Sequence, residues 1–136
     1  MSLLQNSPAL SLPSTVLVVE DDDMLRLLTL EVVIELGLPA VGFATADDAL
    51  AYVQAGGDTG MVITDHSMPG QLTGNDLATL LVQQHPGLPV ILTSGYGYAA
   101  EQKAPGVTFL PKPWGVEVLA TLVMTLLAAR NAQRPG

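Results

Sequence analysis

The sequence has no cysteine and little positive charge, and both shortages narrow its possible functions. The lack of cysteine excludes disulfides and thiolate metal sites and suits a reducing compartment, so we expect a cytoplasmic protein. Five Lys and Arg stand against thirteen Asp and Glu, which gives a net charge of −8. Nucleic-acid binding depends on clustered cations, so we expect no nucleic-acid partner. The acidic balance favours metal ions or a basic protein surface instead.

Long hydrophobic runs are also missing. No apolar stretch approaches the about 20 residues that span a bilayer, so we expect no membrane association. Residues 1–13 lack the basic start and apolar stretch of a secretory signal, and we interpret them as a flexible leader. The chain has 136 residues, 49% of them hydrophobic, which suffices for one domain with a core. We place this domain at residues 14–130, followed by a disordered tail at 131–136.

Short apolar runs alternate along the chain with longer segments of helical period. The predicted strands are residues 15–19, 40–44, 60–64, 89–94 and 107–110. The predicted helices are residues 22–37, 45–55, 72–85 and 114–130, with only a short fourth helix between 95 and 106 because Pro105 and three glycines limit it. This alternation predicts an α/β fold with a parallel sheet, right-handed crossovers and helices on both faces.

Helical period also predicts which side chains face the core. The first helix is expected to bury Leu25, Leu28, Val32 and Leu36. The last helix is expected to bury Val116, Leu119, Val123, Leu126 and Leu127. Asp22 or Asp23 is expected to cap the first helix, and Thr45 the second.

Polar side chains follow four of the predicted strands at their carboxyl ends. The first strand runs into Glu20 and Asp21, the third into Asp65, the fourth into Ser94, and Lys112 follows the fifth. Ligands of open parallel sheets bind at this edge. Three neighbouring carboxylates repel one another, and Mg²⁺, which takes one or two carboxylates plus other oxygen ligands, would relieve that repulsion. We therefore predict Mg²⁺ as the cofactor.

Four motifs on these strand ends resemble a known family. They are "VVEDD" (18–22), "ITDHSMPG" (63–70), "ILTSG" (91–95) and "FLPKPW" (109–114). In this order and spacing the sequence resembles the receiver domain of two-component response regulators, of the single-domain chemotaxis type or the hybrid-kinase type. The resemblance implies a doubly wound, flavodoxin-like (βα)5 fold whose five parallel strands have the order 2-1-3-4-5.

The resemblance implies a role for each acidic residue of the motifs. Asp65 matches the phosphoacceptor, whose carboxylate attacks a phosphohistidine. Asp21 matches the residue that binds Mg²⁺ directly, and Glu20 its neighbour, which acts through water. Ser67 matches the position whose backbone carbonyl completes the metal site.

Three further positions match the part of the family's site that responds to phosphorylation. Ser94 matches the hydroxyl that turns inward to hold the phosphoryl group, and Lys112 the lysine that pairs with the acceptor and phosphoryl oxygens. Phe109 matches the aromatic residue that switches between outward and inward states. The family often has a cis peptide bond before the proline that follows the lysine, here Pro113.

The implied function is that of a phosphoacceptor switch rather than of an enzyme. Its partners would be a sensor histidine kinase or phosphotransfer protein and an unknown downstream protein, and we expect a monomer or weak homodimer. Output would run through the surface of strand 4, helix 4, strand 5 and helix 5, where the short fourth helix departs from the family. The segment "GQLT" (70–73) makes the loop before the third helix one residue longer than usual.

Other interpretations of these residues remain open at this point. Asp21-Asp22-Asp23 offers the Asp-x-Asp pair of a Mg²⁺-dependent haloacid-dehalogenase-type phosphatase, although Met24 stands where that family has Thr or Val. A phosphorylation-independent scaffold of the same fold is a third possibility. Taken singly, an acidic run can be an ordinary helix start, Asp65 a turn residue and Lys112 a solvated loop residue.

Overall fold

The strands of the computed structural model form one parallel sheet, and the structure describes residues 14–95 and 105–133. The strands are β1 (Val16–Val19), β2 (Ala40–Phe43), β3 (Met61–Asp65), β4 (Val90–Ser94) and β5 (Thr108–Pro111). Their order in the sheet is β2-β1-β3-β4-β5, and each neighbouring pair is parallel. The fold and strand order predicted from the sequence are confirmed.

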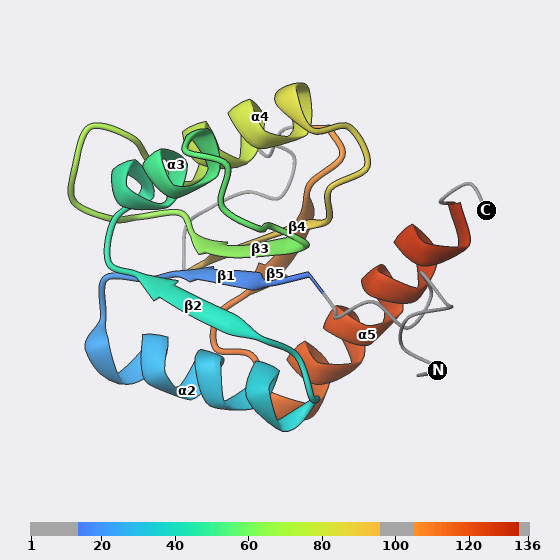
Figure 1. Ribbon diagram of the computed structural model, residues 1–136. Helices are drawn as coiled ribbons and strands as arrows, with labels where there is room; N and C mark the ends of the chain where they lie inside the picture. Colours follow the sequence, from blue (N-terminus) through green and yellow to red (C-terminus); the bar gives the residue numbers. More distant parts are fainter. Residues whose placement is uncertain (1–13, 96–104, 134–136) are drawn as a thin grey trace, which may run out of the picture.

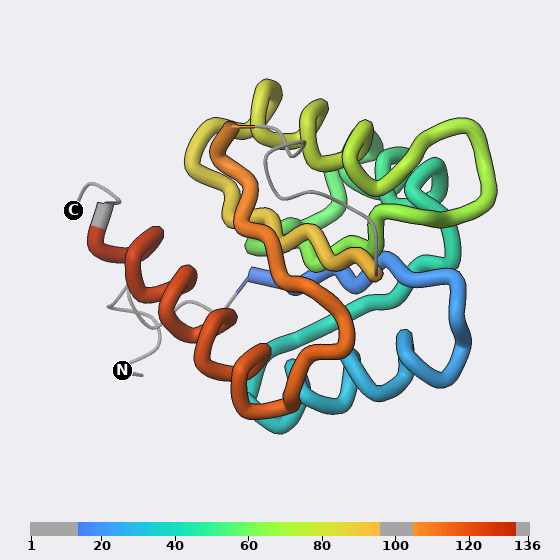
Figure 2. Tube along the Cα trace, turned by 180° about the vertical axis from the view of Figure 1, so that it is seen from behind, coloured from blue at the N-terminus to red at the C-terminus, as the bar shows by residue number. Residues whose placement is uncertain are grey.

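Helices cover both faces of this sheet (Figure 1). The helices α3 (Ala46–Gln54) and α4 (Gly74–Gln84) lie on one face, and α2 (Asp23–Glu35) and α5 (Val116–Gln133) lie on the other. Seen from behind, the chain leaves β5 through a turn and continues into α5 (Figure 2). None of the helices in the described part of the chain has the length and hydropathy that crossing a bilayer requires. Most of the predicted short fourth helix lies outside the described residues.

The central strands are buried on both faces, which is why they read as unbroken apolar runs. Leu17, Val62 and Leu92 pack under α3 and α4, whereas Val18, Ile63 and Ile91 pack under α2 and α5. This alternation fixes the register of each strand, since a slip of one residue would exchange the two faces. The register in turn fixes which side chains stand at the carboxyl ends of the strands.

Two of the predicted core positions are wrong. Leu28 of α2 is 41% exposed and Val116 of α5 is 49% exposed. In α2 the buried face instead includes Thr29, whose hydroxyl donates to the carbonyl of Leu25 over 2.8 Å and is thereby satisfied inside the core. A pattern of apolar residues alone misses such a position.

Capping residues mark where three of the helices begin. Asp22 caps α2 and Thr45 caps α3, as predicted. The helix α4 begins at Gly74, two residues after its predicted start, because Thr73 and Asp76 form a capping box. At the other end of the chain, α5 continues to Gln133, so the predicted helix end at residue 130 is wrong by three residues.

Candidate functional site

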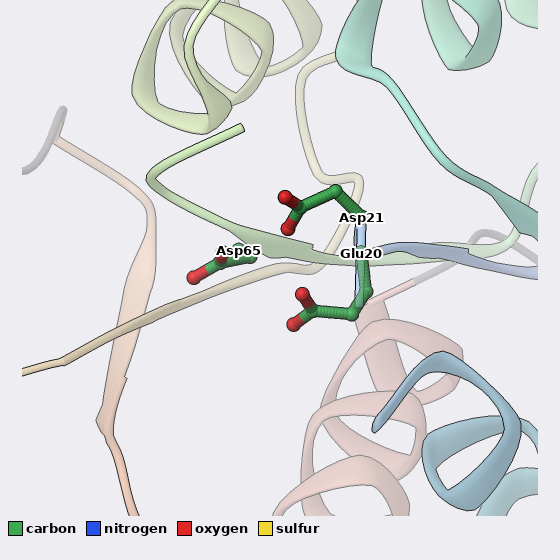
Figure 3. Close-up of side chains that lie close together, drawn as sticks. All are labelled: Glu20, Asp21 and Asp65. Atoms are coloured by element: carbon green, nitrogen blue, oxygen red, sulfur yellow. The ribbon is translucent and has the colours of Figure 1, made fainter. Parts of the chain in front are cut away.

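Three carboxylates meet at the carboxyl ends of β1 and β3 (Figure 3). These two strands are parallel neighbours, so their ends lie at the same edge of the sheet. One carboxylate oxygen from each of Glu20, Asp21 and Asp65 lies within 4.8 Å of the other two. Glu20 and Asp65 are only 5% and 6% exposed, whereas Asp21 is exposed. The sequence therefore predicted this cluster correctly as a spatial group.

Hydrogen bonds fix the backbone that carries Glu20. Its N–H donates to the carbonyl of Phe43 on β2 over 2.9 Å. Its own carbonyl accepts a hydrogen bond of 2.9 Å from Nη1 of Arg26, and Nη2 of the same arginine contacts Asp23 at 2.8 Å. Arg26 thus ties the first turn of α2 to the end of β1. The sequence analysis did not identify this arginine.

Lys112 directly follows β5 and contacts both buried carboxylates. Its Nζ lies 3.0 Å from Oδ1 of Asp65 and 3.2 Å from Oε1 of Glu20. The backbone N–H of Lys112 donates to the carbonyl of Ser94 over 2.8 Å, which fixes the loop after β5 against β4. The peptide bond between Lys112 and Pro113 is cis. Lys112 is therefore part of the site and not a solvated loop residue.

Burial and charge act against each other on the ionisable groups of the site. Burial raises the pKa of Glu20, and the negative charge of Asp65 raises it further. The N–H of Asp22 and the ammonium of Lys112 lower this pKa, but the net shift is upward. For Lys112, burial lowers the pKa, but hydrogen bonding and attraction from Asp65 and Glu20 outweigh it, so the pKa is raised. The lysine is held charged between the two carboxylates.

The remaining predicted residues lie around this centre. Ser94 ends β4 and is 4% exposed. Phe109 on β5 is half-buried and stands opposite Leu92, two residues before Ser94, which places Phe109 and Ser94 on the same face of the sheet. Ser67 is exposed and lies two residues beyond Asp65.

Two hydrogen bonds hold the loop after Asp65, one at its base and one two residues before its end. The carbonyl of His66 accepts from the N–H of Gly74 over 2.9 Å, which closes residues 66–74 into a loop. Two residues before Gly74, the N–H of Leu72 donates to Oδ1 of Asp47 on α3 over 3.2 Å. Sequence reasoning missed Asp47 and Gly74; the isolated glycine in "LTGND" was a signal of close backbone approach.

Histidine takes no part in the acidic cluster. Among the residues that the structure describes, the one group of possible metal ligands comprises Glu20, Asp21 and Asp65. His66 is half-buried in the loop after β3, and His85 is exposed at the end of α4. The donor set is therefore made of carboxylate oxygens, which suit hard divalent cations.

Comparison with known proteins decides the family. Residues 16–124 match the family model of the response regulator receiver domain. The chain belongs to this family. It is 32% identical over 133 residues to the sensor kinase CckA of Brucella abortus, a match that covers 94% of this chain and 14% of that protein. The chain thus spans about a seventh of the length of this curated relative.

Solved structures of receiver domains have the same fold. The response regulator receiver protein from Sinorhizobium medicae superposes with a TM-score of 0.80 at 24% identity, over 87% of this chain and 97% of that one. The receiver domain of the hybrid histidine kinase CckA superposes with a TM-score of 0.70 at 31% identity, over 83% of this chain and 98% of that one. Receiver domains are signalling domains of two-component systems, and the chain shares their architecture.

Proposed function

We propose that this receiver domain is a phosphoacceptor switch and that Asp65 takes a phosphoryl group from the phosphohistidine of a sensor histidine kinase or phosphotransfer protein. The observation that carries the proposal is the contact of 3.0 Å between Asp65 and Lys112 at the sheet edge where Glu20 and Asp21 also converge. A buried nucleophile, a fixed cation and further oxygen ligands are the parts that phosphoryl transfer needs, because it depends mainly on positioning and charge neutralisation.

The chemistry follows from these parts. An Asp65 carboxylate oxygen attacks phosphorus, its new O–P bond forms, and the P–N bond to the donor histidine breaks, with the electron pair returning to the imidazole. Lys112, already 3.0 Å from Asp65, neutralises charge on the acceptor and on the transferred oxygens. The product is an acyl phosphate on Asp65. Ser94, at the adjacent strand end, donates its hydroxyl to the phosphoryl group.

The residues present fit a magnesium ion. Three carboxylates and one ammonium leave two negative charges at the site, which a divalent cation would balance. Glu20, Asp21 and Asp65 would hold it, with the backbone carbonyl of Ser67 as a further ligand. When bound, Mg²⁺ would neutralise charge on the phosphoryl oxygens.

Ser94 and Phe109 form the proposed switch. Ser94 moves inward toward the phosphoryl group, and the space beside it is filled by Phe109, which lies on the same face of the sheet. Burying a phenyl ring contributes about 1.5–3 kcal/mol relative to full exposure, and Phe109 gains part of this because it starts half-buried. The resulting change in surface reaches β4, β5 and α5 and is read by a downstream protein.

The competing phosphatase function is disfavoured by the partners of the acidic run. Asp22 accepts from the N–H of Leu25 as the cap of α2, and Asp23 is paired with Arg26 at 2.8 Å. The Asp-x-Asp pair of such a phosphatase would need Asp23 at the site. We therefore propose no multiple-turnover enzyme, only phosphoacceptance with slow self-phosphorylation and self-dephosphorylation.

We place this activity in the cytoplasm, with no nucleic-acid or membrane partner and with a monomer or weak homodimer as the acting form. The exposed apolar side chains of α2 support docking of a protein partner. Met24 is 76% exposed and Leu27 53% exposed, and both follow the acidic residues of the site by a few positions. The donor protein would cover this surface while it presents its phosphohistidine to Asp65.

Incubation with acetyl phosphate and Mg²⁺ tests the proposal. Intact-mass measurement should show one added phosphoryl group that base removes, and Asp65→Asn should show none. Asp48→Asn is the matched control, because Asp48 is an exposed aspartate on α3 and should leave labelling unchanged. Equal labelling of Asp65→Asn, or many turnovers of a chromogenic phosphate ester, would refute the proposal.

A further inference from the structure

A second concave surface lies at the amino-terminal edge of the sheet, opposite the acidic cluster. It is lined by the carboxyl-terminal halves of α4 and α5 and by the loops that lead into β4 and β5, and we call it the α4–α5 cavity. Its volume is about 590 Å³, within the range of about 300–1,000 Å³ that is usual for small-molecule sites. Of the described residues that line it, none belongs to the acidic cluster.

Proline and glycine shape the loop side of the α4–α5 cavity. Pro86 and Pro89 stand in the loop before β4, and Pro105 stands before β5; their rings fix the backbone angle φ. Between and beside them, Gly87 and Gly106 have φ values of +91° and +90°, which residues with a Cβ rarely adopt, and they place no side chain in the cavity. The backbone of both loops therefore holds this space open, so a ligand that enters it orders little additional chain.

The charge of the lining is opposite to that of the chain. The chain has a net charge of −8, yet the described residues that line the cavity include one charged side chain, that of Arg130. Nη1 of Arg130 donates to the carbonyl of Gly60, which anchors the guanidinium beside the cavity. A guanidinium has five N–H donors and forms paired hydrogen bonds with a carboxylate. The cavity is therefore suited to an anion whose body is apolar.

The concave surface on the outer side of α2 provides a contrast. Its exposed apolar side chains lie beside two carboxylates, those of Asp22 and Glu31. Negative charge repels an anion from that surface, whereas it would retain a cation. The charge of an apolar ligand should consequently decide which of the two surfaces it occupies.

We propose that the α4–α5 cavity binds an apolar monocarboxylate, of the class of medium-chain fatty acids. Its carboxylate is held by Arg130, and its hydrocarbon chain packs against Val82, Leu88 and Leu126. Burial of the hydrocarbon supplies most of the affinity, and the guanidinium supplies the selectivity for an anion. Because the cavity and Asp65 lie at opposite edges of the sheet, the site goes beyond the proposed phosphoacceptor function and does not depend on it.

Titration of ¹⁵N-labelled protein with decanoate, below the concentration at which decanoate forms micelles, tests the site. The amide shifts should concentrate on the lining residues Thr79, Gln83, Gly87, Gly106 and Arg130. Decanol has the same length without the charge and should bind at least about tenfold more weakly, the factor expected for a charge-assisted hydrogen bond. Decyltrimethylammonium should leave these amides unshifted. Equal affinity for decanoate and decanol, or decanoate shifts concentrated on α2, would overturn the proposal.

Two substitutions at exposed positions of α5 separate the cavity from the surface around it. Ala129 lines the cavity and is exposed, so Ala129→Trp should fill the space without burying the ring in the core and should abolish the decanoate shifts. Ala128→Trp is the matched control, because Ala128 is also exposed but is not among the lining residues, and it should bind decanoate as wild type does. Equal effects of the two substitutions would show that decanoate does not occupy the cavity.

Removal of the guanidinium tests the proposed selectivity. Arg130→Met should lower the affinity for decanoate to that for decanol and leave the affinity for decanol unchanged. Arg134→Met removes the same charge at a position outside the described residues and should bind decanoate as tightly as wild type. Unchanged decanoate affinity in Arg130→Met would overturn the proposal. Arg130 also donates to Gly60, so thermal unfolding is measured in parallel, and if Arg130→Met does not fold the two tryptophan variants decide.

The failure of this site and the failure of the proposed function are distinguishable. Asp65→Asn, which should accept no phosphoryl group, should bind decanoate with the affinity of wild type. Decanoate shifts centred on Lys112 instead of the cavity lining would mean that the anion binds the other cation, and the site would be wrong whether or not Asp65 is phosphorylated.

Discussion

Gly74 lies directly against the main-chain carbonyl of Asp65: a Cβ atom on Gly74 would stand 1.7 Å from that oxygen. The first turn of α4 therefore packs onto the end of the strand that carries Asp65, the proposed phosphoacceptor. The N–H of Gly74 also donates to His66 over 2.9 Å, which leaves the backbone little freedom to move away. The stability of the fold and the geometry of the site meet at this contact.

Replacing Gly74 by alanine should consequently destabilise the protein. We expect Gly74→Ala to lower the free energy of unfolding by about 1–3 kcal/mol, the usual cost of overpacking a tight site. Denaturant unfolding followed by Trp114 fluorescence measures it. Gly95→Ala is the matched control, since a Cβ on Gly95 meets nothing within 4 Å. Equal stability of Gly74→Ala and wild type would contradict the close contact.

Asp47 should stabilise the loop that follows Asp65. Its Oδ1 accepts from the N–H of Leu72 over 3.2 Å, so Asp47→Ala should cost about 0.5–1.5 kcal/mol and speed hydrogen exchange at the Leu72 amide. Asp47→Asn keeps an acceptor oxygen and should restore most of the protection. Asp48→Ala removes an exposed carboxylate from the same helical turn and should leave this amide unchanged. Identical exchange in all three variants would argue against the contact.

The stability of the metal-free protein should depend on pH through Glu20. Its pKa is raised, chiefly by burial, so the folded state binds this proton more tightly than the unfolded state does. The contribution of Glu20 to stability therefore falls as pH rises through its folded-state pKa and recovers as pH is lowered. Glutamine at position 20 cannot ionise, so Glu20→Gln does not carry this pH dependence. The melting temperature of Glu20→Gln should therefore rise relative to that of wild type at neutral pH, and this difference should shrink toward pH 5.

Melting curves in the presence of a chelator between about pH 5 and pH 7.5 test this dependence. Only the difference between the two proteins matters, since the other acidic groups titrate in both. A difference that is constant across the range, or that grows as pH falls, would mean that Glu20 is not a strained carboxylate in the folded protein.

The surface change on phosphorylation should include Ser94 and Phe109. Beryllofluoride with Mg²⁺ imitates the phosphoryl group, and we expect amide shifts at Ser94, Phe109 and the neighbouring residues of β4, β5 and α5. Phe109 has no hydroxyl to hold it in an outward state, so the response should be modest. Shifts confined to residues 20–22 and 65–70 would refute the coupling.

Sequence reasoning predicted the site because the site is built from strand ends. Parallel strands bring their carboxyl ends to one edge, so Glu20, Asp65, Ser94 and Lys112 could be placed at the same edge of the sheet, and close together if their strands are neighbours. The strand order itself was predicted from the resemblance to receiver domains, because apolar runs do not indicate which strands are neighbours in the sheet.

Other features depended on side-chain reach and packing, which a sequence pattern does not contain. The contact between Glu20 and Lys112 joins the ends of two side chains whose residues are 92 positions apart in the sequence. Leu28 and Val116 were assigned to the core by helical period, but the helices turn these residues outward. Periodicity gives the direction of a helical face only to within one residue, and packing against neighbouring elements decides the rest.

The proposed function depends above all on Asp65 as the acceptor, and locating the label tests this most directly. Wild type is phosphorylated with acetyl phosphate and Mg²⁺ and reduced with borohydride, which converts an aspartyl phosphate to homoserine, and its peptides are sequenced by mass spectrometry. We predict homoserine at position 65 and at no other aspartate. A label on Asp21, on a serine or on a histidine, with Asp65 unmodified, would contradict the account.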